Sequence, residues 1–293
     1  MRLEVLKTYK IYIGGQFPRT ESGRYYSPLS KTGKKLANVC LCSRKDFRDA
    51  VVAARSAFAG WSNRAAFNRS QILYRMAEML EGRKAQFIDE LILQGATRAA
   101  AEKEVHLATD RLIYYAGWCD KFQQLFSGVN PVASSHFNFS APEPTGVVAI
   151  IAPQGDALLG LVSLIAPVIA GGNTCVVLAA ADKPLCAVTF AEVLNSSDLP
   201  GGVVNILTGK PEELASWFAG HMDVNATFYC EKDTDIQKMI REKSADNLKR
   251  IHFYDTIDWY SDKGQSPYFI MDAQEIKTTW HPVENIAGAG GGY

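Results

Sequence analysis

The sequence has no excess of either charge. Its 293 residues include 31 lysines and arginines and 31 aspartates and glutamates. A balanced chain creates no overall field that would attract nucleic acid or an acidic lipid surface. The sequence also lacks a basic tract with interleaved aromatic residues, so we expect no nucleic-acid partner.

Long apolar segments are also lacking. The longest apolar run, Ala157–Ala170, is shorter than the ~20 residues that a membrane-spanning helix needs. The first fifteen residues have scattered charges and no apolar core before small residues, so we expect no secretory signal peptide. These features predict a cytoplasmic protein without a membrane span.

Paired cysteine spacing is missing as well. The six cysteines are spread along the chain, and only Cys40 and Cys42 lie close together. One intervening residue fits neither a two-residue redox motif nor a zinc knuckle. The five histidines share no ligand spacing. We therefore expect reduced thiols and no metal site.

The first segment, residues 1–143, is predicted to hold a short hairpin followed by helices. Tyr9–Phe17 alternates apolar and polar residues and turns at Gly14-Gly15, which is typical of a hairpin. Ser43 to Asp46 is a possible capping box, and apolar residues then recur at helical spacing. The same spacing predicts a second and a third helix, and a long fourth one from Arg98 to Leu125.

The second segment, residues 144–275, changes pattern. Short apolar strands alternate with helices, and Gly- or Pro-containing turns join them, which is typical of a parallel sheet covered on both faces. We predict a doubly wound, Rossmann-like α/β fold. Residues 276–293 are predicted to be a Gly-rich tail. The five predicted strands are Gly146–Ile151, Thr174–Leu178, Val203–Leu207, Asn225–Tyr229 and Leu248–Tyr254.

Seven short segments stand out by their order and spacing: Tyr114–Lys121, Pro144–Pro153, Ala170–Val177, Leu199–Gly209, His221–Val224, Asn247–Ile251 and Gly264–Pro267. Taken together, these segments resemble the aldehyde dehydrogenase superfamily. The resemblance implies a cofactor domain that binds NAD or NADP. It also implies a catalytic set made of a cysteine nucleophile, a glutamate base and an oxyanion-holding asparagine.

Most of the family's catalytic and cofactor-binding residues are missing from the matching positions. The family's P-W-N motif corresponds to Pro153-Gln154-Gly155, so a glycine stands where the oxyanion amide belongs. Gln154 is one residue out of place, and its side chain is expected to point elsewhere. The lysine and glutamate that hold the adenosine ribose correspond to Leu178 and Ala181, with Lys183 as an alternative for the lysine.

The phosphate-binding glycines and the catalytic base are replaced too. The first glycine of the family's G-S-T-x-x-G motif is Cys230, and Glu231 follows it, so like charge should repel a bound pyrophosphate. The base position holds Tyr254, which is a poor base at neutral pH. The family's catalytic cysteine lies beyond the point where this sequence stops, and Cys119, Cys175 and Cys230 do not match it.

These replacements predict a vestigial cofactor site with no catalytic residues and no bound cofactor. We call it the strand-end site; it consists of Pro153, Gly155, Leu178, Ala181, Gly209, Cys230 and Tyr254.

The resulting hypothesis is an inactive, dehydrogenase-like chain that serves as an assembly or regulatory subunit of a full-length aldehyde dehydrogenase. It resembles the degenerate second copy of double-domain family members. We expect a homo-oligomer or a hetero-oligomer, with Trp280 of the tail in an interface or against the strand-end site. Two alternatives stay open. One is a subunit that binds NAD or NADP and completes its site with a partner chain, and the other is a small-ligand sensor.

Overall fold

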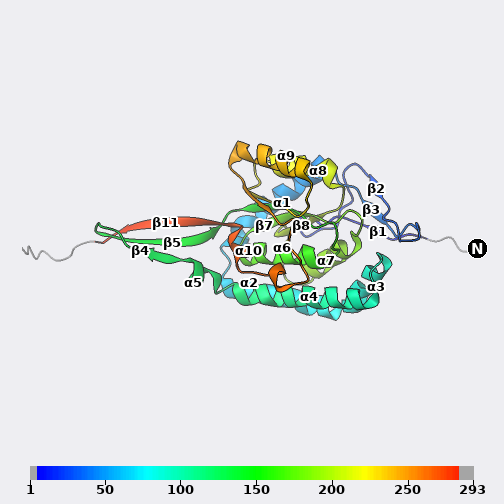
Figure 1. Cartoon of the computed structure of the whole chain (residues 1–293), viewed down its shortest axis with the longest axis horizontal. Helices are drawn as coiled ribbons and strands as arrows, with labels where there is room; N and C mark the ends of the chain where they lie inside the picture. Colours follow the sequence, from blue (N-terminus) through cyan, green and yellow to red (C-terminus); the bar gives the residue numbers. More distant parts are fainter. Residues whose placement is uncertain (1–4, 284–293) are drawn as a thin grey trace, which may run out of the picture.

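The computed structural model describes residues 5–283. A sheet lies at its centre, between helices on both sides (Figure 1). This sheet has five strands in the order β10-β9-β6-β7-β8, and every neighbouring pair is parallel. The predicted α/β fold is confirmed, because each strand coincides with one of the five predicted runs. The strands are β6 (Val147–Ile151), β7 (Thr174–Leu178), β8 (Val204–Leu207), β9 (Ala226–Tyr229) and β10 (Arg250–Phe253).

Alternate residues of the central strands pack into two different cores. Val148 and Ile150 of β6 belong to a large cluster formed with the helices on one face. Val147, Ala149 and Ile151 belong to a second cluster on the opposite face. A strand that is buried on both sides favours apolar residues on both of its faces, which explains the nearly continuous apolar runs.

One face of the sheet carries two helical layers. Helix α6 (Leu159–Ala170) has all twelve residues buried, because it lies between the sheet and the outer helices. A helix that is apolar all round is a buried helix, and this explains the longest apolar run of the sequence. The other helices of this face are α2 (Ala66–Gly82), α3 (Lys84–Leu93), α4 (Arg98–Trp118) and α7 (Leu185–Asn195).

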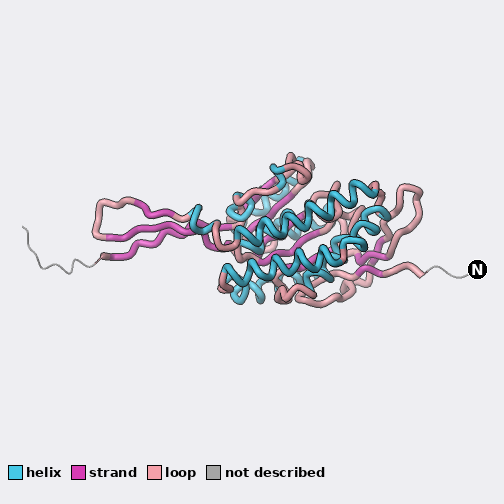
Figure 2. The backbone as a smooth tube through the Cα atoms, turned by 90° about the horizontal axis from the view of Figure 1, so that it is seen from below, coloured by secondary structure: helices cyan, strands magenta, loops and turns pink. Residues whose placement is uncertain are grey.

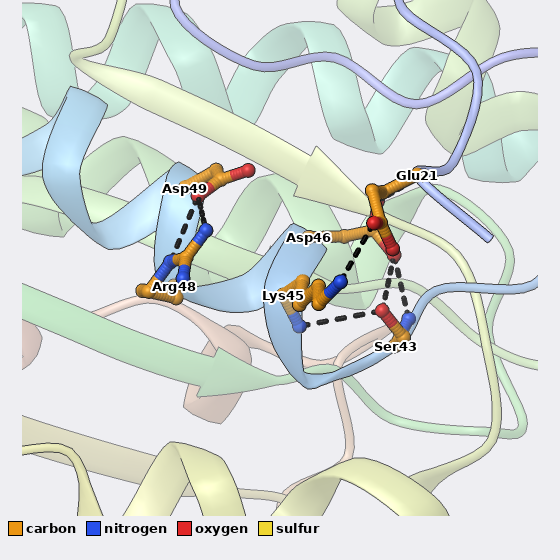
Figure 3. A network of polar contacts seen from close by, with 6 residues as sticks. All are labelled: Glu21, Ser43, Lys45, Asp46, Arg48 and Asp49. Atoms are coloured by element: carbon orange, nitrogen blue, oxygen red, sulfur yellow. Dashed lines mark hydrogen bonds and ion pairs between the residues drawn. The ribbon is translucent and has the colours of Figure 1, made fainter.

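The opposite face is covered by α1 (Arg44–Ser62), α8 (Pro211–Gly220) and α9 (Thr234–Ser244) (Figure 1). The predicted capping box at the start of α1 is confirmed. The backbone N–H of Ser43 donates to Asp46 Oδ2 at 2.7 Å, and the Ser43 hydroxyl accepts from the backbone N–H of Lys45 (Figure 3). This reciprocal arrangement determines where α1 begins.

The N-terminal residues add short strands beside the core. Ile13 and Gln16 exchange two backbone hydrogen bonds of 3.0 Å around the predicted Gly14-Gly15 turn. Tyr12 bridges Ile206 of β8, so the turn is attached to the edge of the central sheet. A separate small sheet, in the order β1-β3-β2, contains β1 (Thr8–Tyr9), β2 (Tyr25–Tyr26) and β3 (Asn38–Cys40).

A three-stranded antiparallel sheet projects from the body; we call it the arm. Both views show it extending away from the helices (Figures 1 and 2). Its strand order is β11-β5-β4, and nine residue pairs join β11 to β5, from Gln274↔Pro144 to Pro282↔His136. The arm consists of β4 (Gly128–Asn130), β5 (His136–Pro144) and β11 (Gln274–Pro282).

Two sequence predictions are wrong in this part of the chain. Residues 276–282 of the predicted tail form most of β11, because β5 supplies their hydrogen-bonding partners from a distant part of the sequence. The rest of the predicted tail, 284–293, lies outside the described residues. The predicted helix from Arg98 to Leu125 ends at Trp118, and α5 (Phe122–Phe126) follows it after a turn.

Three short helical segments complete the described chain. They are η1 (Ala245–Asn247), η2 (Asp262–Gly264) and α10 (Tyr268–Met271).

Candidate functional site

The seven residues of the strand-end site lie at or just beyond the carboxyl ends of the five central strands. In an open α/β sheet this edge is where ligands bind. Across the edge, following the strand order, the structure places Tyr254 after β10, Cys230 after β9, Pro153 and Gly155 after β6, Leu178 and Ala181 at and after β7, and Gly209 after β8.

The side chain of Gln154 forms hydrogen bonds with backbone groups just beyond β6 and just beyond the neighbouring strand β7. Its side-chain Nε2 donates to Ala152 O at 2.9 Å, and its Oε1 accepts from the backbone N–H of Ala181 at 2.8 Å. Both polar ends of the amide are therefore used within the strand ends. That Gln154 does not replace the missing oxyanion asparagine stays a prediction.

Glu231 occupies the space next to this strand end. Its Oε1 accepts from the backbone N–H of Gln154 at 2.6 Å. A backbone N–H at a strand end is a natural donor for an anionic ligand or oxyanion, and here a carboxylate of the chain itself takes it. An anionic ligand would find the Gln154 N–H already hydrogen-bonded, and the Glu231 carboxylate would repel it.

The N-terminus of α9 is capped in the same way. Asp233 Oδ1 accepts from the backbone N–H groups of Asp235 and Ile236, each at 3.0 Å. These are the free donors that a helix N-terminus offers to a phosphate. The Asp233 carboxylate takes two of these donors and thereby caps α9.

Cys230 is a buried thiol rather than a nucleophile. Only 7% of its surface is exposed, and burial, followed by the neighbouring Glu231 charge, raises its pKa well above the usual value. A nucleophilic cysteine needs the opposite environment, which stabilises the thiolate. All six cysteines of the sequence lie within the described residues, and each is free and buried.

Tyr254 is likewise held in its protonated form. Its hydroxyl donates to Asp272 Oδ2 at 2.6 Å, and burial, followed by the Asp272 charge, raises the pKa of the phenol. The adjacent Asp255 accepts from Gln237 Nε2 at 2.8 Å. Tyr254 thus donates its only hydroxyl proton to a carboxylate, and one oxygen of Asp255 is held by Gln237.

The structure adds three residues that the sequence analysis did not single out. Glu104 of α4 accepts from the backbone N–H of Leu158 at 2.8 Å, at the start of α6, and from the Tyr260 hydroxyl at 3.0 Å. Burial, followed by the Glu104 charge, raises the pKa of Asp156 to about 6. Since Glu104 and Asp156 come from distant parts of the sequence, no local motif could have revealed the pair.

A cavity of about 340 Å³ lies beside these acids. It is lined by Glu104, Tyr260 and Lys183, among others, and of the strand-end residues only Gly155 reaches it. Lys183 donates to the Gly155 carbonyl across its rim. The seven predicted residues thus share one edge of the sheet, but six of them do not line this cavity.

The described residues contain no group of three or more His, Cys, Asp or Glu side chains that could hold a metal ion. Between residues 5 and 283, no helix has both the length and the apolarity that a bilayer crossing requires.

The comparisons with known proteins agree with the fold. The model of the aldehyde dehydrogenase family matches residues 18–254. The chain belongs to this family. It is 30% identical to the putative aldehyde dehydrogenase DhaS of Bacillus subtilis (strain 168) over 275 residues, which cover 92% of this chain and 53% of the relative.

Other family members are similar over the same part. The cytosolic 10-formyltetrahydrofolate dehydrogenase of Mus musculus is 31% identical, over 85% of this chain and 28% of that protein. The solved structure of HpcC from Thermus thermophilus has a TM-score of 0.80 at 28% identity and covers 85% and 48% of the two chains. The NAD⁺ complex of a Bacillus cereus aldehyde dehydrogenase has a TM-score of 0.79 at 25% identity, covering 84% and 50%.

The chain therefore spans about half the length, or less, of the family members it matches. Strand β11 lies beyond the residues that the family model matches, yet it completes the arm. The predicted membership of the aldehyde dehydrogenase family is confirmed.

Proposed function

We propose that this chain is a catalytically inactive member of the aldehyde dehydrogenase family that acts as an assembly or regulatory subunit of a full-length aldehyde dehydrogenase. The observation that carries the proposal is the hydrogen bond from the Gln154 backbone to Glu231. It supports the proposal because a carboxylate of the chain takes a backbone donor one residue before Gly155, the position that matches the family's oxyanion asparagine.

The strand-end site does not fit a dinucleotide. The donors at the start of α9 are taken by Asp233, and Leu178, at the position of the ribose-binding lysine, is a fully buried apolar residue. Ala181 has no side-chain acceptor for a ribose hydroxyl. We therefore derive no cofactor-dependent step for this chain, and we expect NAD and NADP to bind negligibly.

The arm supports the assembly part of the proposal. A hollow on its surface is lined mainly by apolar side chains, among them Val129, Phe137 and Phe139. Val129 is 65% exposed and Phe137 is 47% exposed. Apolar side chains gathered on a projecting sheet are typical of a surface that a partner covers. The partner could be a second copy of the chain or a full-length family member.

The proposal is tested by co-expressing the chain with each full-length aldehyde dehydrogenase of its own organism. We expect a stable complex with one of them, measured by size-exclusion chromatography with light scattering. We also expect the purified chain alone to oxidise no short or aromatic aldehyde. Turnover by the chain alone that is abolished by thiol alkylation would contradict the inactive assignment.

The two alternatives make different predictions. A subunit that completes its site with a partner chain would bind NAD or NADP, and aldehyde oxidation would depend on a residue of both chains. A small-ligand sensor using the strand-end site would bind a ligand without any partner. No contact at the strand-end site favours either alternative. The backbone N–H groups of Gln154, Ala181 and Asp235 already donate to side chains of the same chain.

A further inference from the structure

A second hollow lies on the helical layer of α1, α8 and α9, and it shares no residue with the strand-end site. Its volume is about 430 Å³. The walls come from the first turn of α1, the last turns of α8, the two residues after α8, and the last turn of α9. We call it the basic pocket and define it by Arg44, Lys45, Arg48, Trp217, Met222 and Lys243.

The charged side chains that line the basic pocket are cationic. It contains four permanently cationic side chains and no carboxylate. His221 also lines it, but burial lowers the pKa of this imidazole and favours its neutral form. A concave surface with one sign of charge concentrates ions of the opposite sign.

Two of the four cations are neutralised by neighbours outside the pocket. Figure 3 shows these pairs at the start of α1: Lys45 Nζ lies 2.7 Å from Glu21 Oε1, and Arg48 Nη2 lies 2.8 Å from Asp49 Oδ1. Arg44 and Lys243 differ from them. Among residues 5–283, no carboxylate lies within 4 Å of either side chain's charged nitrogens, so neither forms an ion pair there.

The pocket also has an aromatic wall. The guanidinium carbon of Arg44 lies 4.9 Å from the Trp217 ring centroid, and the indole is 42% exposed. Met222 beside it is 64% exposed. Tryptophan, methionine and arginine are the residue types that binding surfaces use as anchors. Behind them the buried Phe47, which also lines the pocket, stacks on Phe218.

We propose that the basic pocket binds a small organic anion with an aromatic body. Arg44 and Lys243 would hold the anionic group, and the ring would lie against Trp217 and Met222. The volume is within the range of small-molecule sites, and a hollow suits such a ligand better than the flat face of a protein partner. The proposal concerns a site that is separate from the assembly function.

The test uses 2-naphthalenesulfonate as the probe and neutral 2-naphthalenesulfonamide as its matched control, both measured by isothermal titration calorimetry on the full chain. We expect saturable binding of the sulfonate and at least tenfold weaker binding of the sulfonamide. Since a hydrogen bond to a charged group is stronger than one between neutral groups, Arg44→Gln and Lys243→Gln should each weaken sulfonate binding by roughly tenfold or more.

Lys238→Gln is the control variant, because Lys238 is an exposed lysine of the same helix that does not line the pocket. It should bind the sulfonate like the unaltered chain. Equal affinity for the two probes, or equal losses in all three variants, would overturn the proposal. So would binding of an acidic tryptophan-containing peptide when the sulfonate does not bind, since that result identifies a protein partner instead.

Discussion

The backbone N–H of Gln154 donates to Glu231 Oε1 at 2.6 Å, which joins the end of β6 to the end of β9 across the candidate site. Removing the charge of Glu231 should weaken this bond, because a charged acceptor makes it stronger than a neutral one. We expect Glu231→Gln to lower the free energy of unfolding by about 1–2 kcal/mol, as measured by urea denaturation. Glu242→Gln, at an exposed position of α9, is the control and should change it little.

Cofactor binding provides a second test. With Asp233 at the start of α9 and Leu178 at the ribose position, NAD⁺ and NADP⁺ should give no saturable heat at millimolar concentration in a calorimetric titration. A full-length aldehyde dehydrogenase titrated in parallel serves as the positive control. Micromolar affinity in this chain would show that the site is open to a dinucleotide.

Thiol reactivity follows from burial. Because burial raises the pKa of Cys175, Cys186 and Cys230, native protein at pH 8 should react with a disulfide reagent much more slowly than a free thiol does. All six thiols should react once the chain is unfolded in guanidinium chloride. The released chromophore measures both rates. One rapidly reacting thiol in the native protein would contradict this prediction.

Asp156 predicts a defined pH dependence. Its pKa in the folded protein, about 6, lies above the value of 3.8 for a free aspartate. Between these values the folded state therefore binds more protons than the unfolded state, so this group lowers stability as the pH rises from about 4 to about 6. Asp156→Asn removes the cost. We expect it to raise the free energy of unfolding by about 1–3 kcal/mol at pH 7.5.

The same variant should have little effect near pH 4, where the unfavourable ionisation of Asp156 in the folded state has hardly begun. Urea denaturation of both proteins at pH 4, 5, 6 and 7.5 gives the difference at each value. A stability difference that does not depend on pH would mean that Asp156 is not the titrating group.

The arm provides the test of assembly. Phe137→Glu places a charge in the apolar hollow and should shift the chain from an oligomer to a monomer in light scattering. Phe67→Glu is the matched control, because Phe67 is 69% exposed on α2 in the body and does not line the hollow. Dissociation by both variants, or by neither, would argue against the arm as the interface.

The sequence by itself determined the central sheet and the family. The apolar runs of β6, β7 and β9 and the fully apolar helix α6 are local patterns. Such patterns are readable because burial on both faces favours apolar residues at most positions of a strand. The capping box of Ser43 and Asp46 is equally local, since the two partners are close neighbours in the sequence.

Tertiary structure alone decided the arm and the interior of the candidate site. β11 is a strand because β5 supplies its backbone partners, and a lone segment of this composition carries no such information. The pairing of Gln154 with Glu231, and of Glu104 with the start of α6, likewise depends on distant parts of the chain meeting. The sequence identified which family residues are replaced; only the fold placed carboxylates on the donors that a ligand would need.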